Sequence, residues 1–164
     1  MARDLPQLLS DYCHAFSEFD IAAIKEFYER DALLRFHTIE DGSASTSSLH
    51  TGGIFKSLWK GKVPFELAFW KIIRELKARS YDHATADLLE VYEPKEDGRR
   101  AGTGSAHILV DYRRINKAGA VYAHFGVVYR CVKAEGEWLL AEMWQFEKAS
   151  DPPPSIRAIF DSIR

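Results

Sequence analysis

Apolar residues recur every three or four positions in three segments of the chain, which is the spacing of one face of an α-helix. These segments cover residues 5–16, 21–28 and 65–78. Asp20 precedes the second segment and suits an N-cap, because its side chain can accept from free backbone amides. Pro64 opens the third segment, where its missing N–H is tolerated. We therefore predict three helices at these positions, with a short helical turn at 54–61.

From His83 onward the apolar positions alternate, and this period of two indicates β-strands. The predicted strands cover residues 83–93, 105–115, 121–133 and 138–147, and short polar turns join them, the first at 96–98. Long consecutive strands with tight turns form an antiparallel meander.

Two further segments complete the prediction. A strand at 32–38 is followed by residues 40–53, which are small, polar and punctuated by glycine, and which we interpret as a long mobile loop. A proline-rich break at 151–154 precedes a terminal helix at 155–163. Helices followed by a meander predict a single α+β domain over 1–164, a cone-shaped roll in which a strongly curved antiparallel sheet wraps around the helix at 65–78.

Alternation also predicts which side chains face the interior. On the two central strands these are Ala106, Ile108, Val110, Tyr112, Val121, Ala123, Phe125, Val127, Tyr129 and Cys131. The opposite set is polar, and forms either a homodimer surface or a solvated face: His107, Asp111, Arg113, Tyr122, His124 and Arg130. The last strand is ambiguous, because both of its faces are partly apolar. We expect Glu142 to point inward with Trp138, Leu140, Trp144 and Phe146.

Composition narrows the classes of function. The net charge of −2 gives no basic excess for a phosphate backbone, so no nucleic-acid partner is expected. No apolar stretch approaches the ~18 residues of a membrane span, and no secretory signal is evident, so we expect a cytoplasmic protein with no membrane partner. Cys13 and Cys131 form no paired motif, and the six histidines lack metal-ligand spacing. We therefore expect no metal and no cofactor.

The layout resembles the nuclear transport factor two-like superfamily, which includes SnoaL-like polyketide cyclases, scytalone dehydratases and ketosteroid isomerases. The likeness covers residues 5–147 and rests on the order of several motifs. Residues 27–32 (Phe-Tyr-Glu-Arg-Asp-Ala) are similar to the step into the first strand of that family, and 79–83 to its entry into the second. Residues 129–138, with their Glu-Gly-Glu turn, are similar to one of its hairpins.

This resemblance implies a cone whose wide end is an open pocket for a small apolar or aromatic molecule. A histidine at position 83 would act there as a general acid or base, since its pKa lies near neutrality. The sequence departs from the dehydratase pattern at Tyr112 and near Val127, where that pattern has a histidine and an asparagine. Fold does not fix activity in this superfamily.

The candidate catalytic residues are His83, Glu142 and His37. Each has a structural alternative. His83 could be a hydrogen-bonded histidine at a strand start, and Glu142 could be a carboxylate paired with Arg or Lys on the outer face. His37 could be a surface histidine. The candidate substrate-binding residues are Tyr12, Trp59, Phe69, Tyr112, Tyr129 and Trp144. Tyr12 and Tyr129 could instead be core residues whose hydroxyls bond locally.

Two functions follow as hypotheses. The first is a cofactor-independent isomerase, dehydratase or cyclase that uses acid/base catalysis in the pocket. The second is a non-catalytic ligand-binding or dimerisation module that has the same fold. The two differ in whether His83 and Glu142 meet in one cavity.

Overall fold

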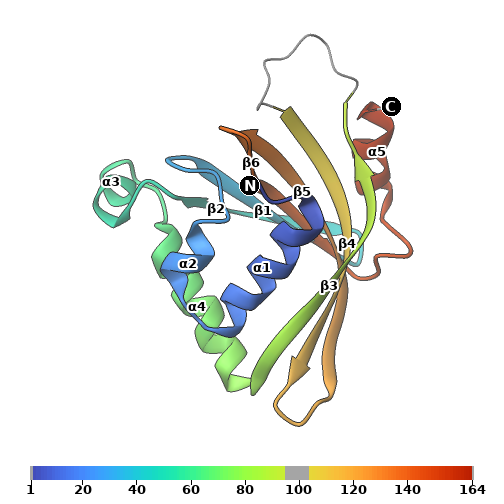
Figure 1. Ribbon diagram of the computed structural model, residues 1–164, viewed down its shortest axis with the longest axis horizontal. Helices are drawn as coiled ribbons and strands as arrows, with labels where there is room; N and C mark the ends of the chain where they lie inside the picture. Colours follow the sequence, from blue (N-terminus) through green and yellow to red (C-terminus); the bar gives the residue numbers. More distant parts are fainter. Residues whose placement is uncertain (1, 95–103, 164) are drawn as a thin grey trace.

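The structure is a computed structural model that describes residues 2–94 and 104–163 (Figure 1). The elements in chain order are α1 (Leu5–Ser17), α2 (Ile21–Lys25), β1 (Leu33–Glu40), β2 (Ser43–His50), α3 (Ile54–Trp59), α4 (Phe65–Ala78), β3 (Tyr81–Tyr92), β4 (Gly104–Asn116), β5 (Val121–Ala134), β6 (Glu137–Phe146) and α5 (Pro154–Ile163). The helices and the meander predicted from periodicity are present. The predicted turn at 96–98 lies outside the described residues.

The six strands form one mixed sheet in the order β2-β1-β6-β5-β4-β3. Strands β3 to β6 pair antiparallel with their chain neighbours, which confirms the meander. Strand β1 lies parallel to β6, so the sheet is not wholly antiparallel as the sequence predicted. The architecture is α+β with a sheet that does not close.

Residues 40–53 were predicted to be a long loop, and this prediction is wrong. Strand β2 fills most of the segment and pairs with β1 along its whole length. The hairpin turns at Asp41 and Gly42, whose φ angles are 48° and 77°. An Asp-Gly pair suits a two-residue hairpin turn, because both positions need positive φ. Strand β2 was not predicted because its serines and threonines are largely exposed and show no apolar alternation.

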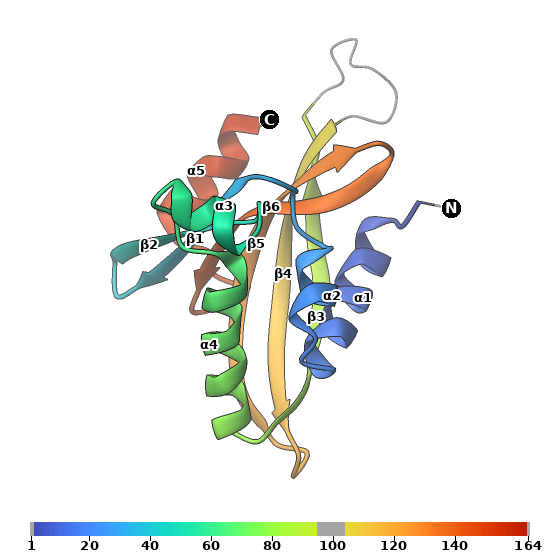
Figure 2. The ribbon, with the colours of Figure 1, turned by 90° about the vertical axis from the view of Figure 1, so that its left-hand side faces the viewer.

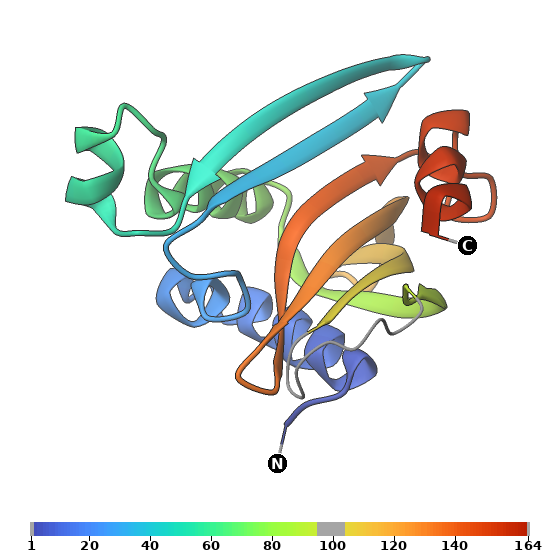
Figure 3. The same cartoon turned by 90° about the horizontal axis from the view of Figure 1, so that it is seen from above.

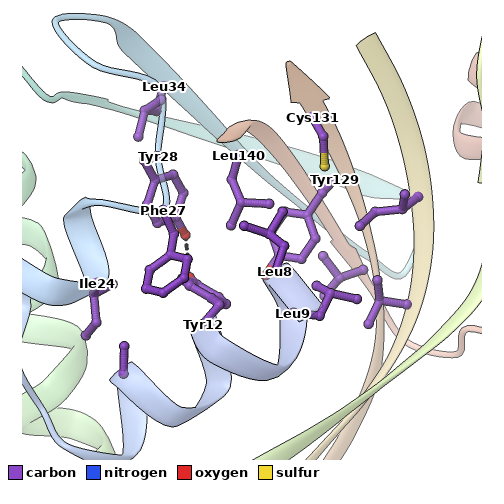
Figure 4. Packing of buried hydrophobic residues seen from close by; sticks show 14 of the residues in the cluster. Leu8, Leu9, Tyr12, Ile24, Phe27, Tyr28, Leu34, Tyr129, Cys131 and Leu140 are labelled. Atoms are coloured by element: carbon purple, nitrogen blue, oxygen red, sulfur yellow. Dashed lines mark hydrogen bonds between the residues drawn. The ribbon is translucent and has the colours of Figure 1, made fainter. Parts of the chain in front are cut away.

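Helices cover both faces of the sheet (Figure 2). Helices α1, α2 and α4 lie over the inner face, and α5 lies over part of the opposite, outer face (Figure 3). Two long helices, α1 and α4, therefore share the inner face that the sequence assigned to the helix at 65–78 alone. The main core joins α1 and α4 to inward residues of β4 and β5, among them Ile108, Val110 and Val127. Figure 4 shows part of this core, where Leu8 and Leu9 of α1 lie near Tyr129 and Cys131 of β5.

A β-bulge in β6 explains why the face assignment of that strand was ambiguous. Arg130 pairs with Glu142 and Cys131 pairs with Leu140, so Ala141 is an extra residue that reverses the alternation. Leu140 consequently packs in the main core. Beyond the bulge, Trp144 packs into a second cluster under α5, on the outer face.

The expectation that Glu142 points inward is therefore wrong. Its carboxylate accepts a hydrogen bond from the Arg130 guanidinium at 3.2 Å on the outer face. This is the structural alternative given above, in which Glu142 is paired with an arginine.

Candidate functional site

Four tyrosines meet between the helices and the inner face of the sheet, and their hydroxyls bond in pairs. Tyr12 bonds to Tyr28 (Figure 4). The hydroxyls of Tyr112 and Tyr129 lie 3.2 Å apart. Burial raises the pKa of all four phenols, and the neighbouring phenols add to the effect for Tyr12 and Tyr112. All four are therefore neutral at physiological pH. Tyr12 and Tyr129 are core tyrosines with local partners, as their structural alternative stated.

The sequence assigned Phe69 to the same interior, and the structure places it there. Phe69 stacks on Phe65 with their ring centroids 4.0 Å apart. Four of the six predicted substrate-binding residues, Tyr12, Phe69, Tyr112 and Tyr129, are thus buried in one cluster. They are packed against protein side chains, which is the arrangement of a core.

The other two predicted substrate-binding residues lie elsewhere. Trp59 is 92% exposed on α3. Trp144 lies on the outer face, where its ring stacks on His37 at 5.1 Å. Neither belongs to the interior, because α3 projects away from the sheet and the bulge at Ala141 turns Trp144 outward.

His83 does not reach the interior either. Its Nδ1 bonds to Asp82 Oδ2 at 2.6 Å, and its side chain is 46% exposed. Asp82 is the extra residue of a bulge, and the neighbouring Ala84 packs against the core, so His83 lies on the opposite side of β3. This is the structural alternative of a hydrogen-bonded histidine at a strand start.

His37 and Glu142 do lie together, but on the outer face. His37 Nε2 is 2.7 Å from Glu142 Oε2, and His37 Nδ1 is 2.8 Å from the Thr46 hydroxyl. The Glu142 side chain is only 16% exposed. Across the strands lies His107, whose pKa is lowered by burial and then by the Arg130 charge. This outer cluster therefore places an imidazole and a carboxylate in direct hydrogen-bond contact.

Several of the outward-facing polar residues of β4 and β5 form hydrogen bonds or ion pairs with one another. His124 Nε2 bonds to Asp111 Oδ1 at 2.7 Å, and Arg113 lies 3.6 Å from the same carboxylate group. Helix α5 covers another part of this face. A homodimer through the outer face stays a prediction.

A groove lies between α2 and the start of α4. Its volume is about 630 Å³, and its walls combine apolar and charged residues: Ile21, Ala22, Lys25, Glu26, Tyr28, Glu29, Arg30, Thr51 and Glu66. Tyr28 is buried at its base and bonds to Tyr12, so the groove backs onto the interior tyrosines. Asp20 caps α2 by accepting from Ala23 N at 3.1 Å, which fixes the helix that forms one wall.

One carboxylate oxygen in this groove lacks a partner. Lys25 Nζ lies 2.5 Å from Glu66 Oε1. Glu66 Oε2 is buried and has no hydrogen-bond partner among the described residues. A buried acceptor without a donor is costly, so such an atom indicates a place for a ligand group or a water molecule. Glu66 lines the groove, so a molecule bound there could donate to this oxygen only by reaching past the atoms that cover it.

Sequence reasoning missed this groove. Glu66 lies in the first turn of α4, where the helix dipole favours a negative charge, and this position alone suggests only a structural role. Lys25 is 41 residues away, and the pairing depends on how α2 packs against α4. Within the described ranges, no group of three His, Cys, Asp or Glu side chains could hold a metal ion.

Neither a protein-family model nor a curated protein matches the sequence. Solved structures do match. A nuclear transport factor two-like protein of unknown function from Shewanella oneidensis MR-1 aligns with a TM-score of 0.56 at 9% identity, over 87% of this chain and 95% of that one. A domain of unknown function with a cystatin-like fold from Nostoc punctiforme gives 0.54 at 11% identity, over 94% and 80%.

A ketosteroid isomerase-like protein from Erwinia carotovora gives a TM-score of 0.50 at 15% identity, over 87% of this chain and 92% of that one. The chain has the nuclear transport factor two-like, or cystatin-like, fold. The resemblance stated from the sequence is confirmed at the level of fold. Function has to be argued from the site, since identities this low carry no residue roles.

Proposed function

We propose that this protein is a small-molecule-binding domain whose ligand lies in the groove between α2 and α4. The observation that carries the proposal is the buried Glu66 Oε2 atom, which has no donor among the residues that the structure describes. Glu66 lines a groove of about 630 Å³. Grooves of this size suit small organic ligands, and an unsatisfied polar atom on a partly apolar wall orients such a ligand.

The chemistry of the groove favours an aromatic or apolar body that carries one neutral donor. Ile21, Ala22 and the Tyr28 ring offer apolar contact. The Lys25 ammonium group already pairs with Glu66, and it would repel a cationic group placed beside Glu66 Oε2. A phenol or an alcohol donates to Glu66 Oε2 without this repulsion.

Binding fits the groove better than acid/base catalysis does. His83 and Glu142 lie outside it, and they do not share a cavity with each other. Within the groove, the Glu66 carboxylate is held by Lys25 in an ion pair. The non-catalytic hypothesis therefore gains support from the positions of the residues that catalysis would need.

The experiment compares 2-naphthol with 2-methoxynaphthalene, which has the same ring system and no hydroxyl donor. Calorimetric titration of the wild-type protein should show tighter binding of 2-naphthol. Glu66→Ala should remove that preference, while Glu75→Ala on the exposed side of the same helix should keep it. A hydrogen bond to a charged acceptor contributes about 1.5–3 kcal/mol, so the preference should be about tenfold to a hundredfold.

Two results would contradict the proposal. One is equal affinity for the two compounds in the wild-type protein. The other is a preference for 2-naphthol that survives in Glu66→Ala while circular dichroism shows a folded variant.

The outer cluster supports a second candidate function, acid/base catalysis at the sheet surface. The specific observation is the 2.7 Å contact between His37 Nε2 and Glu142 Oε2, with Trp144 stacked on the imidazole. Such a dyad can take a proton from a substrate and return it, as isomerisation, dehydration or cyclisation requires. If a screen of such substrates finds turnover, His37→Gln and Glu142→Gln should abolish it and Glu66→Ala should not.

A further inference from the structure

Helix α3 is inverted with respect to an ordinary surface helix. Its polar residue Ser57 is fully buried, whereas its large apolar residues are exposed: Phe55 is 91% exposed and Trp59 is 92% exposed. Ile54 and Leu58 are exposed as well. We name these four apolar residues the α3 patch. Two large aromatic rings that face solvent on one short helix indicate an interaction surface.

Polar contacts hold α3 in place. The Ser57 hydroxyl bonds to His50 Nδ1 at 2.8 Å and to the Gly53 carbonyl at 2.5 Å. At the exposed side, Lys56 Nζ donates to Asp31 Oδ2 at 2.6 Å. The Phe55 and Trp59 rings, which are almost fully exposed, therefore contribute little to attaching the helix and are free to contact something else.

The helix also projects from the body of the protein. In Figures 1 and 3, α3 lies at one end of the molecule, beyond α4, and α5 lies at the other. A projecting tip can reach a flat surface before the rest of the domain meets it.

The charge around the patch indicates which surface that is. Residues 42–65 contain three lysines, Lys56, Lys60 and Lys62, and no aspartate or glutamate, although the whole chain carries a net charge of −2. Asp31 pairs with Lys56, so Lys60 and Lys62 supply the positive charge beside the patch. Aromatic side chains flanked by lysines favour the boundary between lipid headgroups and acyl chains, particularly in a membrane with anionic lipids. A second copy of this chain fits less well, since a two-fold contact through the patch would bring the lysines of both copies together.

We propose that the α3 patch binds the surface of an anionic lipid membrane. Phe55 and Trp59 enter the headgroup region, and Lys60 and Lys62 face the lipid phosphates and carboxylates. In the described part of the chain, no helix is both long and apolar enough to cross a bilayer. We expected no membrane partner from the sequence because that prediction concerned only segments that span a membrane. The proposal does not depend on the ligand groove.

The test is cosedimentation of the full chain with vesicles of phosphatidylcholine containing 30% phosphatidylserine. Because each basic residue near such a surface changes affinity about fivefold, the charge-reversed variant Lys60→Glu/Lys62→Glu should bind at least tenfold more weakly. Phe55→Ser/Trp59→Ser should lose binding to the same degree. The control Leu89→Ser/Val121→Ser removes two exposed apolar residues outside the patch and should bind as the wild type does.

Blue-shifted fluorescence of Trp59, isolated by comparison with the Trp59→Phe variant, should accompany binding. Three results would overturn the proposal. The first is no binding of the wild-type chain to the anionic vesicles, and the second is unchanged binding by folded Phe55→Ser/Trp59→Ser. The third is a dimer in sedimentation velocity that this variant dissociates, because the patch would then join two copies of the chain.

Discussion

Replacing Gly126 with alanine should destabilise the fold, because the residues after β6 close over this position. A Cβ atom on Gly126 would lie 2.5 Å from Phe146 Cε2, 2.7 Å from Ala149 N and 2.8 Å from Ala149 Cα. Carbon atoms pack best at about 3.5–4.0 Å, so all three contacts are overlaps. Two of the three atoms belong to the backbone and cannot move aside by a rotamer change. Overpacking of this kind costs about 1–3 kcal/mol, and we expect the upper half of that range.

Urea unfolding monitored by circular dichroism measures this cost directly. Gly126→Ala should lower the midpoint with little change in slope, and should lower Tm by about 4–12 °C for a chain of this size. Gly104→Ala is the matched control, because its Cβ would meet no atom of the described residues within 4 Å. A Gly126→Ala variant that unfolds at the same urea concentration as Gly104→Ala would refute the close packing of Phe146 and Ala149 against β5.

Two further predictions follow from the buried ionisable groups. Five of the seven tyrosines have a raised pKa, chiefly through burial, so an absorbance titration of the native protein should leave five phenols protonated near pH 10, whereas all seven ionise in denaturant. The phenols of the unfolded chain lose their protons at lower pH than those of the folded chain. The free energy of unfolding should therefore not change through these groups below about pH 10, and should fall as the pH rises above it. Full ionisation of the native tyrosines at pH 10 would contradict their burial away from water. Burial raises the pKa of Cys13 to about 11 and that of Cys131 to about 12, so both thiols should react slowly with a disulfide reagent at pH 8 until the chain is unfolded. Rapid native reaction of Cys131 would show that β5 opens.

Periodicity predicted most of the fold because most elements have one apolar face. Helices α1 and α4 and the inward faces of β4 and β5 follow this rule, and the structure has them. Strand β2 breaks the rule, because it forms the hairpin edge and its serines face solvent. Its Asp41-Gly42 turn was the local signal that could have revealed it.

The site was harder to predict because it depends on single-residue irregularities and on packing between distant elements. One extra residue, Ala141, moves Glu142 and Trp144 to the outer face, and alternation cannot detect such a bulge. Another, Asp82, precedes His83. The pairing of Lys25 with Glu66 joins two helices, and no motif in the sequence marks it.

The inverted pattern of α3 was not predicted from the sequence. Trp59 was predicted to bind substrate in the pocket, whereas its side chain is 92% exposed. Ser57 is buried instead, since His50 and the Gly53 carbonyl satisfy its hydroxyl.

The most direct test of the proposed function is an amide chemical-shift titration of the ¹⁵N-labelled protein with 2-naphthol. Ligand in the groove should shift the amides of Ile21, Ala22 and Glu66 at the lowest concentrations, and these shifts should be lost in Glu66→Ala. Shifts confined to Tyr112 and Tyr129, or to His37 and its neighbours on the outer face, with α2 unchanged, would contradict binding between α2 and α4.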